Sequence, residues 1–142
     1  MKLLRVITFP FVTVYYLVTV IRNKLYDLGI KKSTSYKFPI ICVGNLSVGG
    51  TGKTPMVEYL LAMLSNKYKV ATLSRGYKRE TSGFILADEN ISVAEIGDEP
   101  FQFYEKFKGK ANIAVDANRQ RGIEELIDKV NPEVLILDDA FQ

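Results

Sequence analysis

A glycine-rich stretch that ends in Gly-Lys-Thr limits what this chain of 142 residues can fold into more than any other feature. It follows a short apolar run at residues 40–43 and precedes residues 54–65, whose apolar spacing favours a helix. A loop between a strand and a helix is the setting of phosphate-binding loops, which have the pattern G-x-x-x-x-G-K-[ST]. The stretch matches that pattern at every defined position but the first, which is serine. Its residues are Ser47, Val48, Gly49, Gly50, Thr51, Gly52, Lys53 and Thr54.

Each residue type in this loop suits a nucleotide with a magnesium ion. The glycines let the backbone turn tightly and bring its N–H groups against phosphate oxygens. The Lys53 ammonium supplies a positive charge for the β- and γ-phosphates, and the Thr54 hydroxyl can ligate Mg²⁺. The N-terminus of the following helix adds its dipole. The sequence therefore predicts that all eight residues bind ATP with Mg²⁺; the alternative is a glycine-rich turn that binds nothing.

A second element of a nucleotide site lies near the end of the sequence. Four consecutive apolar residues at 134–137 predict a strand that is buried on both faces, and Asp138 and Asp139 follow directly. A phosphate-binding loop needs an acidic residue at a strand end to hold Mg²⁺. We therefore expect Thr54, Asp138 and Asp139 to form the metal site, without assigning which carboxylate contacts the ion. The alternative is that both aspartates are capping or turn residues.

The remaining pattern alternates between strands and helices. Residues 40–43, 70–73, 113–115 and 134–137 favour strands, and residues 54–65, 98–107 and 119–130 favour helices. Residues 84–87 and 91–93 suggest a small hairpin around 88–90, and Cys42, within an apolar run, suggests a buried core thiol. The alternation predicts an α/β fold, a three-layer, mostly parallel sheet of P-loop NTPase type over residues 38–142. Because the sequence stops five residues after the last strand, we expect a fragment of a longer protein.

The net charge of +3 is unevenly distributed. Residues 1–40 hold seven Lys or Arg and one acid, whereas the remaining 102 residues hold twelve Lys or Arg and fifteen acids. The acidic balance of the second part argues against a nucleic-acid partner. Within residues 1–30, apolar residues at helical spacing between basic ends favour an interfacial helix that lies on an anionic membrane. A spanning helix and a helix docked on the core are the alternatives, and no small-residue cleavage site supports a signal peptide.

Two further segments carry candidate functional residues. Asp98 opens a predicted helix, where a carboxylate can serve as an N-cap or as the base or orienter for an acceptor hydroxyl. The loop at residues 74–79 contains three cations and a tyrosine, beside the predicted phosphate-binding loop. Such a loop suits an anionic or sugar ligand, although a solvated surface loop has the same composition. From the residues alone, both alternatives stay open.

Together these segments resemble the tetraacyldisaccharide 4′-kinase family, membrane-associated enzymes of lipid A biosynthesis. The resemblance rests on VGNLSVGGTGKTP at residues 43–55, LSRGY at 73–77, GDEP at 97–100 and DDAFQ at 138–142. It implies phosphorylation by ATP of the 4′-hydroxyl of a tetraacyldisaccharide 1-phosphate, at the cytoplasmic face of the inner membrane of a Gram-negative bacterium. It further implies Asp98 as the base, with Lys53 as the other catalytic residue. Arg75 and Tyr77 would lie near the lipid substrate, and Asp138 and Asp139 would serve the metal and phosphate site.

The partners implied are the lipid disaccharide and the lipid surface of the inner membrane, with no nucleic acid and no obligate protein partner. The family's proteins are longer, so further substrate and nucleotide contacts are expected beyond residue 142. A P-loop ATPase or GTPase that acts as a switch or positions a partner is the alternative, because it shares the loop and the acidic strand. A membrane adaptor with a purely structural loop is a third possibility.

Overall fold

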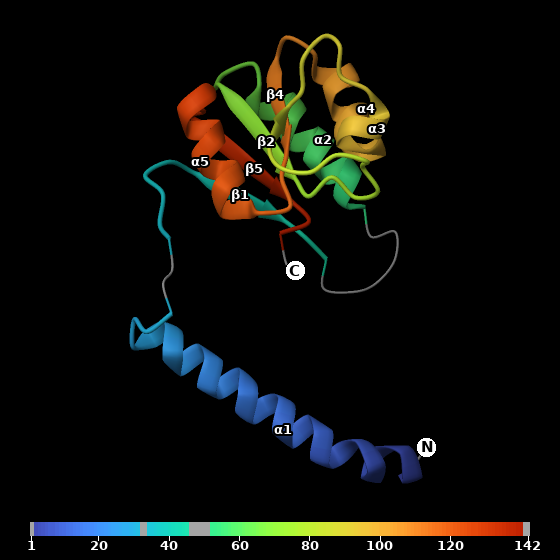
Figure 1. Cartoon of the computed structure of the whole chain (residues 1–142), viewed down its shortest axis with the longest axis vertical. Coiled ribbons are helices and arrows are strands. Elements are labelled where there is room, and N and C mark those ends of the chain that lie inside the picture. Colours follow the sequence, from blue (N-terminus) through green and yellow to red (C-terminus); the bar gives the residue numbers. More distant parts are fainter. Residues whose placement is uncertain (1, 32–33, 46–51, 141–142) are drawn as a thin grey trace. The chain divides into compact units, whose positions relative to one another are not determined.

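The computed structural model describes residues 2–31, 34–45 and 52–140, and the side chains of residues 1–11 and 13 are left out of the description. The chain divides into two compact units, Met1–Tyr36 and Lys37–Gln142. The first unit holds the helix α1 (Lys2–Asp27), and the second holds a five-stranded sheet with its helices (Figure 1). Each unit is treated by itself below.

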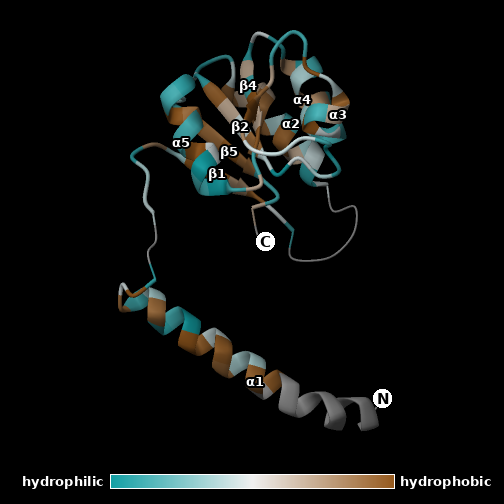
Figure 2. Cartoon of the chain, viewed as in Figure 1, coloured by the Kyte–Doolittle hydropathy of each residue, from teal (hydrophilic) through white to brown (hydrophobic). Residues whose placement is uncertain are grey.

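Helix α1 is a single element of 26 residues that includes Pro10. Along its described part, large apolar side chains are exposed, among them Val14, Tyr15, Leu17 and Val18. Figure 2 shows hydrophobic bands along this helix interrupted by hydrophilic ones. Among the described residues, no helix combines the length and the apolar character that crossing a bilayer requires.

The sheet of the second unit has the order β1-β5-β2-β4-β3. Its strands are β1 (Ile40–Val43), β2 (Val70–Ser74), β3 (Ile85–Leu86), β4 (Ala111–Val115) and β5 (Val134–Asp138). The first four strands in this order are parallel, and the two-residue β3 joins β4 antiparallel. All five residues of β2 and of β5 are buried, as expected for central strands covered on both faces. The predicted mostly parallel sheet is confirmed.

Helices cover both faces of this sheet (Figure 1). On one side lie α2 (Lys53–Leu64), the short α3 (Val93–Ile96) and α4 (Asp98–Phe107), and on the other lies α5 (Arg119–Lys129). Helix α2 packs Val57 and Leu61 into the core, where they join Phe103 and Phe107 of α4 and Ile136 of β5. This arrangement confirms the three-layer α/β architecture. In the parallel strands the carboxyl ends lie at the same edge of the sheet, where ligands bind in folds of this type.

The predicted hairpin at residues 84–93 is wrong. Strand β3 pairs with β4 instead, with Ile85 opposite Val115. The peptide N–H of Asn90 donates to the Asp88 carboxylate at 2.9 Å, so this segment turns locally. Ser92 and Glu95 then form a capping box that starts α3, which occupies the place of the expected second strand.

The prediction that Cys42 is a buried core thiol is also wrong, because the side chain is exposed. Cys42 lies on β1, at the edge of the sheet, opposite Leu137 of β5. Its neighbour Val43, whose side chain lies on the other face, is buried against α2. The apolar run at residues 40–43 therefore forms a strand of which, among the described residues, one face is covered at Val43 and the other is exposed at Cys42.

Candidate active site

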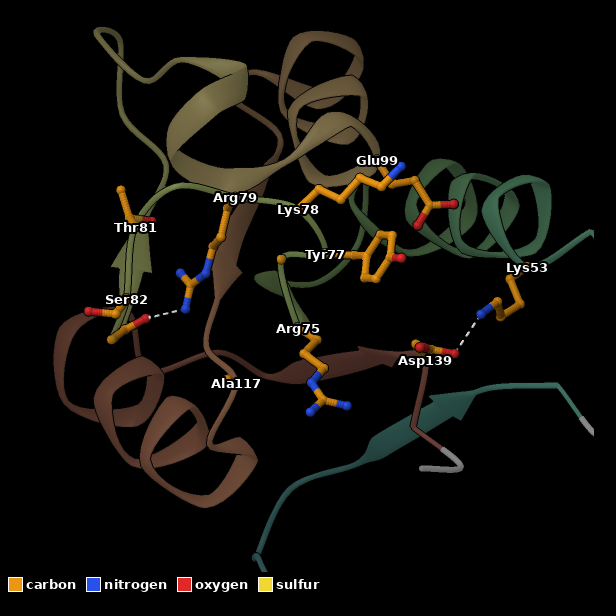
Figure 3. Close-up of a pocket in the computed structure, with 12 residues that line it drawn as sticks. Lys53, Arg75, Tyr77, Lys78, Arg79, Thr81, Ser82, Glu99, Ala117 and Asp139 are labelled. Atoms are coloured by element: carbon orange, nitrogen blue, oxygen red, sulfur yellow. Dashed lines mark hydrogen bonds and ion pairs between the residues drawn. The ribbon is translucent and has the colours of Figure 1, made fainter.

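A cavity of about 700 Å³ opens at the carboxyl edge of the sheet. The first residue of α2, the loop after β2, the first turn of α4 and the residue after β5 all contribute to it. Figure 3 shows Lys53 and Asp139 pointing toward one another at one end of this cavity, with Arg75 and Tyr77 between them and Arg79. The lining residues are Lys53, Arg75, Gly76, Tyr77, Lys78, Arg79, Thr81, Ser82, Gly83, Glu99, Ala117 and Asp139.

The described end of the predicted phosphate-binding loop lies at the start of α2. Gly52 is the N-cap of this helix and has a φ of 80°, a left-handed conformation that glycine adopts without strain. Lys53 is the first residue of the helix, and its ammonium contacts an oxygen of the Asp139 carboxylate at 2.5 Å. This hydrogen bond raises the pKa of Lys53 and keeps the group charged. The expected binding residues Ser47, Val48, Gly49, Gly50 and Thr51 lie outside the described residues.

The two consecutive aspartates occupy different environments. Asp138 is the last residue of β5 and is buried, and it accepts a hydrogen bond of 3.3 Å from the Ser74 hydroxyl. Burial, followed by the neighbouring charge of Glu99, raises the pKa of Asp138 above its ordinary value. Asp139 has a φ of 53°, so the chain turns here and directs its carboxylate to Lys53. Both aspartates follow or end β5 near Lys53, as predicted. Only Asp139 contacts the Lys53 ammonium, whereas Asp138 is buried against Ser74.

Of the two alternatives for Asp98, the N-cap role is excluded, because Gly97 occupies the N-cap and Asp98 is the first residue of α4. Gly97 has a φ of 89°, and a Cβ atom there would lie 2.8 Å from the backbone oxygen of Tyr77. Only glycine allows the two segments to approach so closely. The start of α4 is therefore held against the loop after β2. Asp98 itself is exposed, and the cavity is lined instead by its neighbour Glu99.

Glu99 connects α4 to the nucleotide end of the cavity. Its carboxylate accepts a hydrogen bond of 2.8 Å from the hydroxyl of Thr54, the residue expected to ligate Mg²⁺. Its charge also contributes to the raised pKa of both Lys53 and Asp138. Glu99 belongs to the motif at residues 97–100, but no role was predicted for it. Its partner Thr54 lies 45 residues away in the sequence, and local residue spacing cannot predict such a contact.

The loop after β2 supplies most of the positive charge of the cavity. Arg75 and Tyr77 are exposed and line it, as does Lys78. Arg79 donates a hydrogen bond of 2.7 Å to the carbonyl of Gly83, and burial lowers the pKa of this guanidinium. The loop thus forms a wall of the cavity, and its binding of an anionic or sugar ligand stays a prediction. Arg79 is one of the three cations of this loop, but it was not predicted as a site residue.

Arg119, the first residue of α5, was missed by sequence analysis. Its guanidinium donates hydrogen bonds to the main-chain carbonyls of Asp138 at 2.6 Å and of Asp139 at 2.9 Å. Burial lowers the pKa of Arg119, while the charges of the two aspartates act in the opposite direction. Arg119 and Asp138 are 19 residues apart in the sequence, and no sequence pattern predicts a hydrogen bond between the first turn of a helix and the end of the next strand.

The oxygen groups at this edge suit a magnesium ion bound together with phosphates. Among the described residues, no three His, Cys, Asp or Glu side chains are grouped closely enough to hold a metal by themselves. Mg²⁺ usually takes only one or two carboxylates and completes its shell with water and substrate phosphates. The Thr54 hydroxyl lies at a helix N-terminus that attracts phosphate, and together with one or two of the carboxylates of this edge it would fit such a shell.

A pair of substitutions tests the electrostatics of the site. We expect Asp138→Asn to raise the melting temperature of the nucleotide-free full-length protein at neutral pH by about 3 °C. A carboxyl whose pKa is raised on folding contributes stability that is fully present below its unfolded pKa and lost as the pH rises through its folded pKa. At neutral pH, removal of this buried charge therefore stabilises the fold.

Asp116→Asn is the matched control, because the same chemical change has the opposite expected sign. Asp116 is fully buried, which raises its pKa, but the hydrogen bonds from Arg121 at 2.8 Å and from the Asn118 N–H, together with the charges of Arg121 and Arg79, outweigh burial and lower the pKa. Its contribution to stability is present above its unfolded pKa and is lost as the pH falls through its folded pKa. We expect a decrease of about 5 °C in calorimetry. Equal signs for the two variants would contradict this account.

Comparison with known proteins shows the family of the chain. The family model of the tetraacyldisaccharide-1-P 4′-kinases matches residues 4–142. Curated tetraacyldisaccharide 4′-kinases of Flavobacterium johnsoniae and Flavobacterium psychrophilum are 62% and 57% identical over the whole chain. The chain spans 42% and 41% of the length of these two relatives.

A solved structure is similar as well. It is a crystal structure of the "apo" form of LpxK from Aquifex aeolicus in complex with ATP, with a TM-score of 0.76 and 40% sequence identity. The match covers 98% of this chain and 45% of the other. Because the family model matches nearly the whole chain and the curated relatives share more than half of its residues, the chain belongs to the tetraacyldisaccharide-1-P 4′-kinase family.

Proposed function

We propose that the full-length protein transfers the γ-phosphoryl group of ATP to the 4′-hydroxyl of a tetraacyldisaccharide 1-phosphate. The observation that carries the proposal is the contact between Lys53 and Asp139, at the N-terminus of α2 and at one end of the cavity. This contact joins the described end of the phosphate-binding loop to the acidic strand end. The names of the relatives supply the substrate class.

In this proposal each side chain acts where charge changes during the transfer. Lys53 exchanges its carboxylate partner for phosphate oxygens and stabilises the negative charge on the transferred group. Asp98, in the first turn of α4, accepts the proton of the attacking hydroxyl. Arg75 and Tyr77 hold the disaccharide lipid in the cavity, where a guanidinium suits an anionic group.

Thr54, Asp138 and Asp139 would hold Mg²⁺, and Glu99 joins this set through its hydrogen bond with Thr54. The ion would neutralise charge on the β- and γ-phosphates when it is bound. Thr54 is in the first turn of α2, so its hydroxyl lies at the end of the helix where anions bind. Asp138 is prepared for a cation, since its burial makes an uncompensated charge unfavourable.

The direct test is an assay of the full-length protein with γ-labelled ATP and the disaccharide lipid. We expect label in the lipid at the 4′ position, determined by mass spectrometry, and little ATP hydrolysis when the lipid is left out. An ATPase or GTPase switch would hydrolyse nucleotide at the same rate with and without the acceptor. That result would reject the kinase function in favour of the switch.

We further propose that the protein works at the cytoplasmic face of the inner membrane, with α1 lying in the lipid interface. Exposed apolar side chains on α1 and the excess of basic residues in the first forty positions support this placement. A substrate with acyl chains stays in the bilayer, so an enzyme at the surface meets it there. Each basic residue near an anionic surface contributes roughly 1 kcal/mol to binding.

Deletion of residues 1–25 from the otherwise complete protein is expected to move it from the membrane pellet to the supernatant. The two units of the chain are compact by themselves, so the second unit is expected to keep its fold. A milder variant, Val14→Glu with Val18→Glu, keeps the helix but places charge on two exposed positions one turn apart. We expect it to weaken binding to anionic vesicles about tenfold or more. A truncated protein that still pellets with membranes would contradict the anchor.

A further inference from the structure

We infer that Arg119 is a positioning residue, whose guanidinium fixes the turn at Asp138–Asp139 and thereby the carboxylate that faces Lys53. The inference rests on the proposed function for its kinetic consequence and on the described contacts for its geometry. Arg119 is not among the residues that line the described cavity. Its hydrogen bonds to the main chain of the two aspartates give it a route to the site through these residues.

The guanidinium of Arg119 lies across the carboxyl ends of two neighbouring strands. One of its nitrogens, Nη2, donates to both carbonyls of the turn after β5, at 2.6 Å and 2.9 Å. The other, Nη1, lies 3.5 Å from the carbonyl of Leu73, the next-to-last residue of β2. Main-chain carbonyls at strand ends need hydrogen-bond partners outside the ladder where the ladder stops, and a planar group with five donors can bond several carbonyls at once.

The turn that Arg119 holds has an unfavourable backbone conformation. Asp139 has a φ of 53°, a region that residues with a side chain adopt uncommonly, although aspartate tolerates it better than most. Besides Arg119, three described contacts hold it there: the Ala140 N–H donates to the carbonyl of Val43 at 3.1 Å, the Asp139 N–H donates to the Asp138 carboxylate, and Lys53 contacts the Asp139 carboxylate. Without Arg119, the main chain of the turn would lose the hydrogen bonds that tie it to α5, and ATP would remove the contact with Lys53 as well.

The reach of Arg119 depends on how closely α5 lies on the sheet. At Gly122 a Cβ atom would lie 2.8 Å from the Leu73 side chain and 3.0 Å from that of Asp116, so glycine permits this close approach. The start of the helix is fixed as well: the Asn118 side chain caps it, and the Asn118 N–H donates to Asp116 at 2.8 Å. These contacts place the first residue of α5 beside the strand ends.

Arg119 and Arg121 form a matched pair for the test, because both lie in the first turn of α5 and both use the guanidinium fork. Arg121 pairs with the buried Asp116, away from the aspartate turn. We compare Arg119→Lys, Arg119→Met and Arg121→Lys in the full-length protein. A lysine ammonium at position 119 keeps the charge but cannot bridge both strand ends.

We expect kcat to fall about 100-fold in Arg119→Met and about tenfold in Arg119→Lys, since a carboxylate displaced by about 1 Å costs a factor of this order. The KM for the lipid should change less than about threefold, because Arg119 does not line the cavity. Arg121→Lys is expected to retain kcat within about twofold even where its melting temperature falls. If Arg119→Met fails to fold, the kcat of Arg119→Lys tests the inference.

A second readout separates this inference from the proposed function. Mg²⁺ is expected to strengthen the binding of a fluorescent ATP analogue to the wild-type protein and to Arg121→Lys, and to do so much less in both Arg119 variants. If the wild-type protein transfers no phosphate to the lipid, the proposed function is rejected. The effect of Mg²⁺ on nucleotide binding then tests the positioning role of Arg119 by itself. Unchanged Mg²⁺ dependence and kcat within twofold of wild type in the folded Arg119 variants would overturn the inference and leave Arg119 a purely structural role.

Discussion

Replacing Lys53 with alanine in the full-length protein is expected to reduce phosphate transfer to the disaccharide lipid at least about 1,000-fold. Lys53 is the first residue of α2, so its ammonium lies at the helix end that attracts phosphate. The hydrogen bond with Asp139 raises its pKa, so the group is fully charged at neutral pH. Its loss removes the cation that contacts Asp139, so this carboxylate would face the phosphates without its ion-pair partner. Transfer of label from ATP, followed as a single turnover, measures the effect.

Lys106→Ala is the matched control for this substitution. Lys106, on α4, also makes a 2.5 Å contact with a carboxylate, that of Glu58 on α2, but this pair is not among the residues of the cavity. A surface ion pair of this kind contributes up to about 1 kcal/mol to stability. We expect transfer within about twofold of wild type. Comparable activity of Lys53→Ala and wild type would exclude a phosphate-binding role for the loop.

Much of the core could be predicted because its signals are local. A buried parallel strand must be apolar at every position, and residues 134–137 have this property. The helix pattern of residues 98–107 agrees with the bounds of α4. Once such strands are parallel, their carboxyl ends lie at one edge, so residues that follow them come together. This reasoning placed the two aspartates beside Lys53 and the loop after β2 at the same cavity.

Features that depend on strand order or on long-range contacts could not be predicted in this way. The exposure of Cys42 follows from the position of β1 at the sheet edge, which its apolar neighbours do not reveal. Strand β3 pairs with β4, whose sequence lies about 30 residues further on, so the local hairpin signal was misleading. Glu99 and Arg119 act through contacts between separate elements.

Asp98→Ala is expected to lower kcat by about 100- to 10,000-fold and to leave the affinity for ATP within about threefold. Asp98 begins α4, whose next residue, Glu99, contacts Thr54 at the nucleotide end of the cavity. A base at this position would be near a hydroxyl held beside the γ-phosphate, whereas it would make no contact with the adenine or ribose. Steady-state kinetics together with titration of a fluorescent ATP analogue separate the two quantities.

The competing explanation is that Asp98 serves only the structure of α4. A carboxylate in the first turn of a helix interacts favourably with the helix dipole, an effect of about 0.3–1 kcal/mol. Asp98→Asn removes the charge with little change in shape, and Glu105→Ala removes an exposed carboxylate from the last turn of the same helix. A base predicts that Asp98→Asn is as inactive as Asp98→Ala while Glu105→Ala stays active. A structural role predicts lower melting temperatures and weaker ATP binding in both Asp98 variants, with kcat at saturation close to that of the wild type.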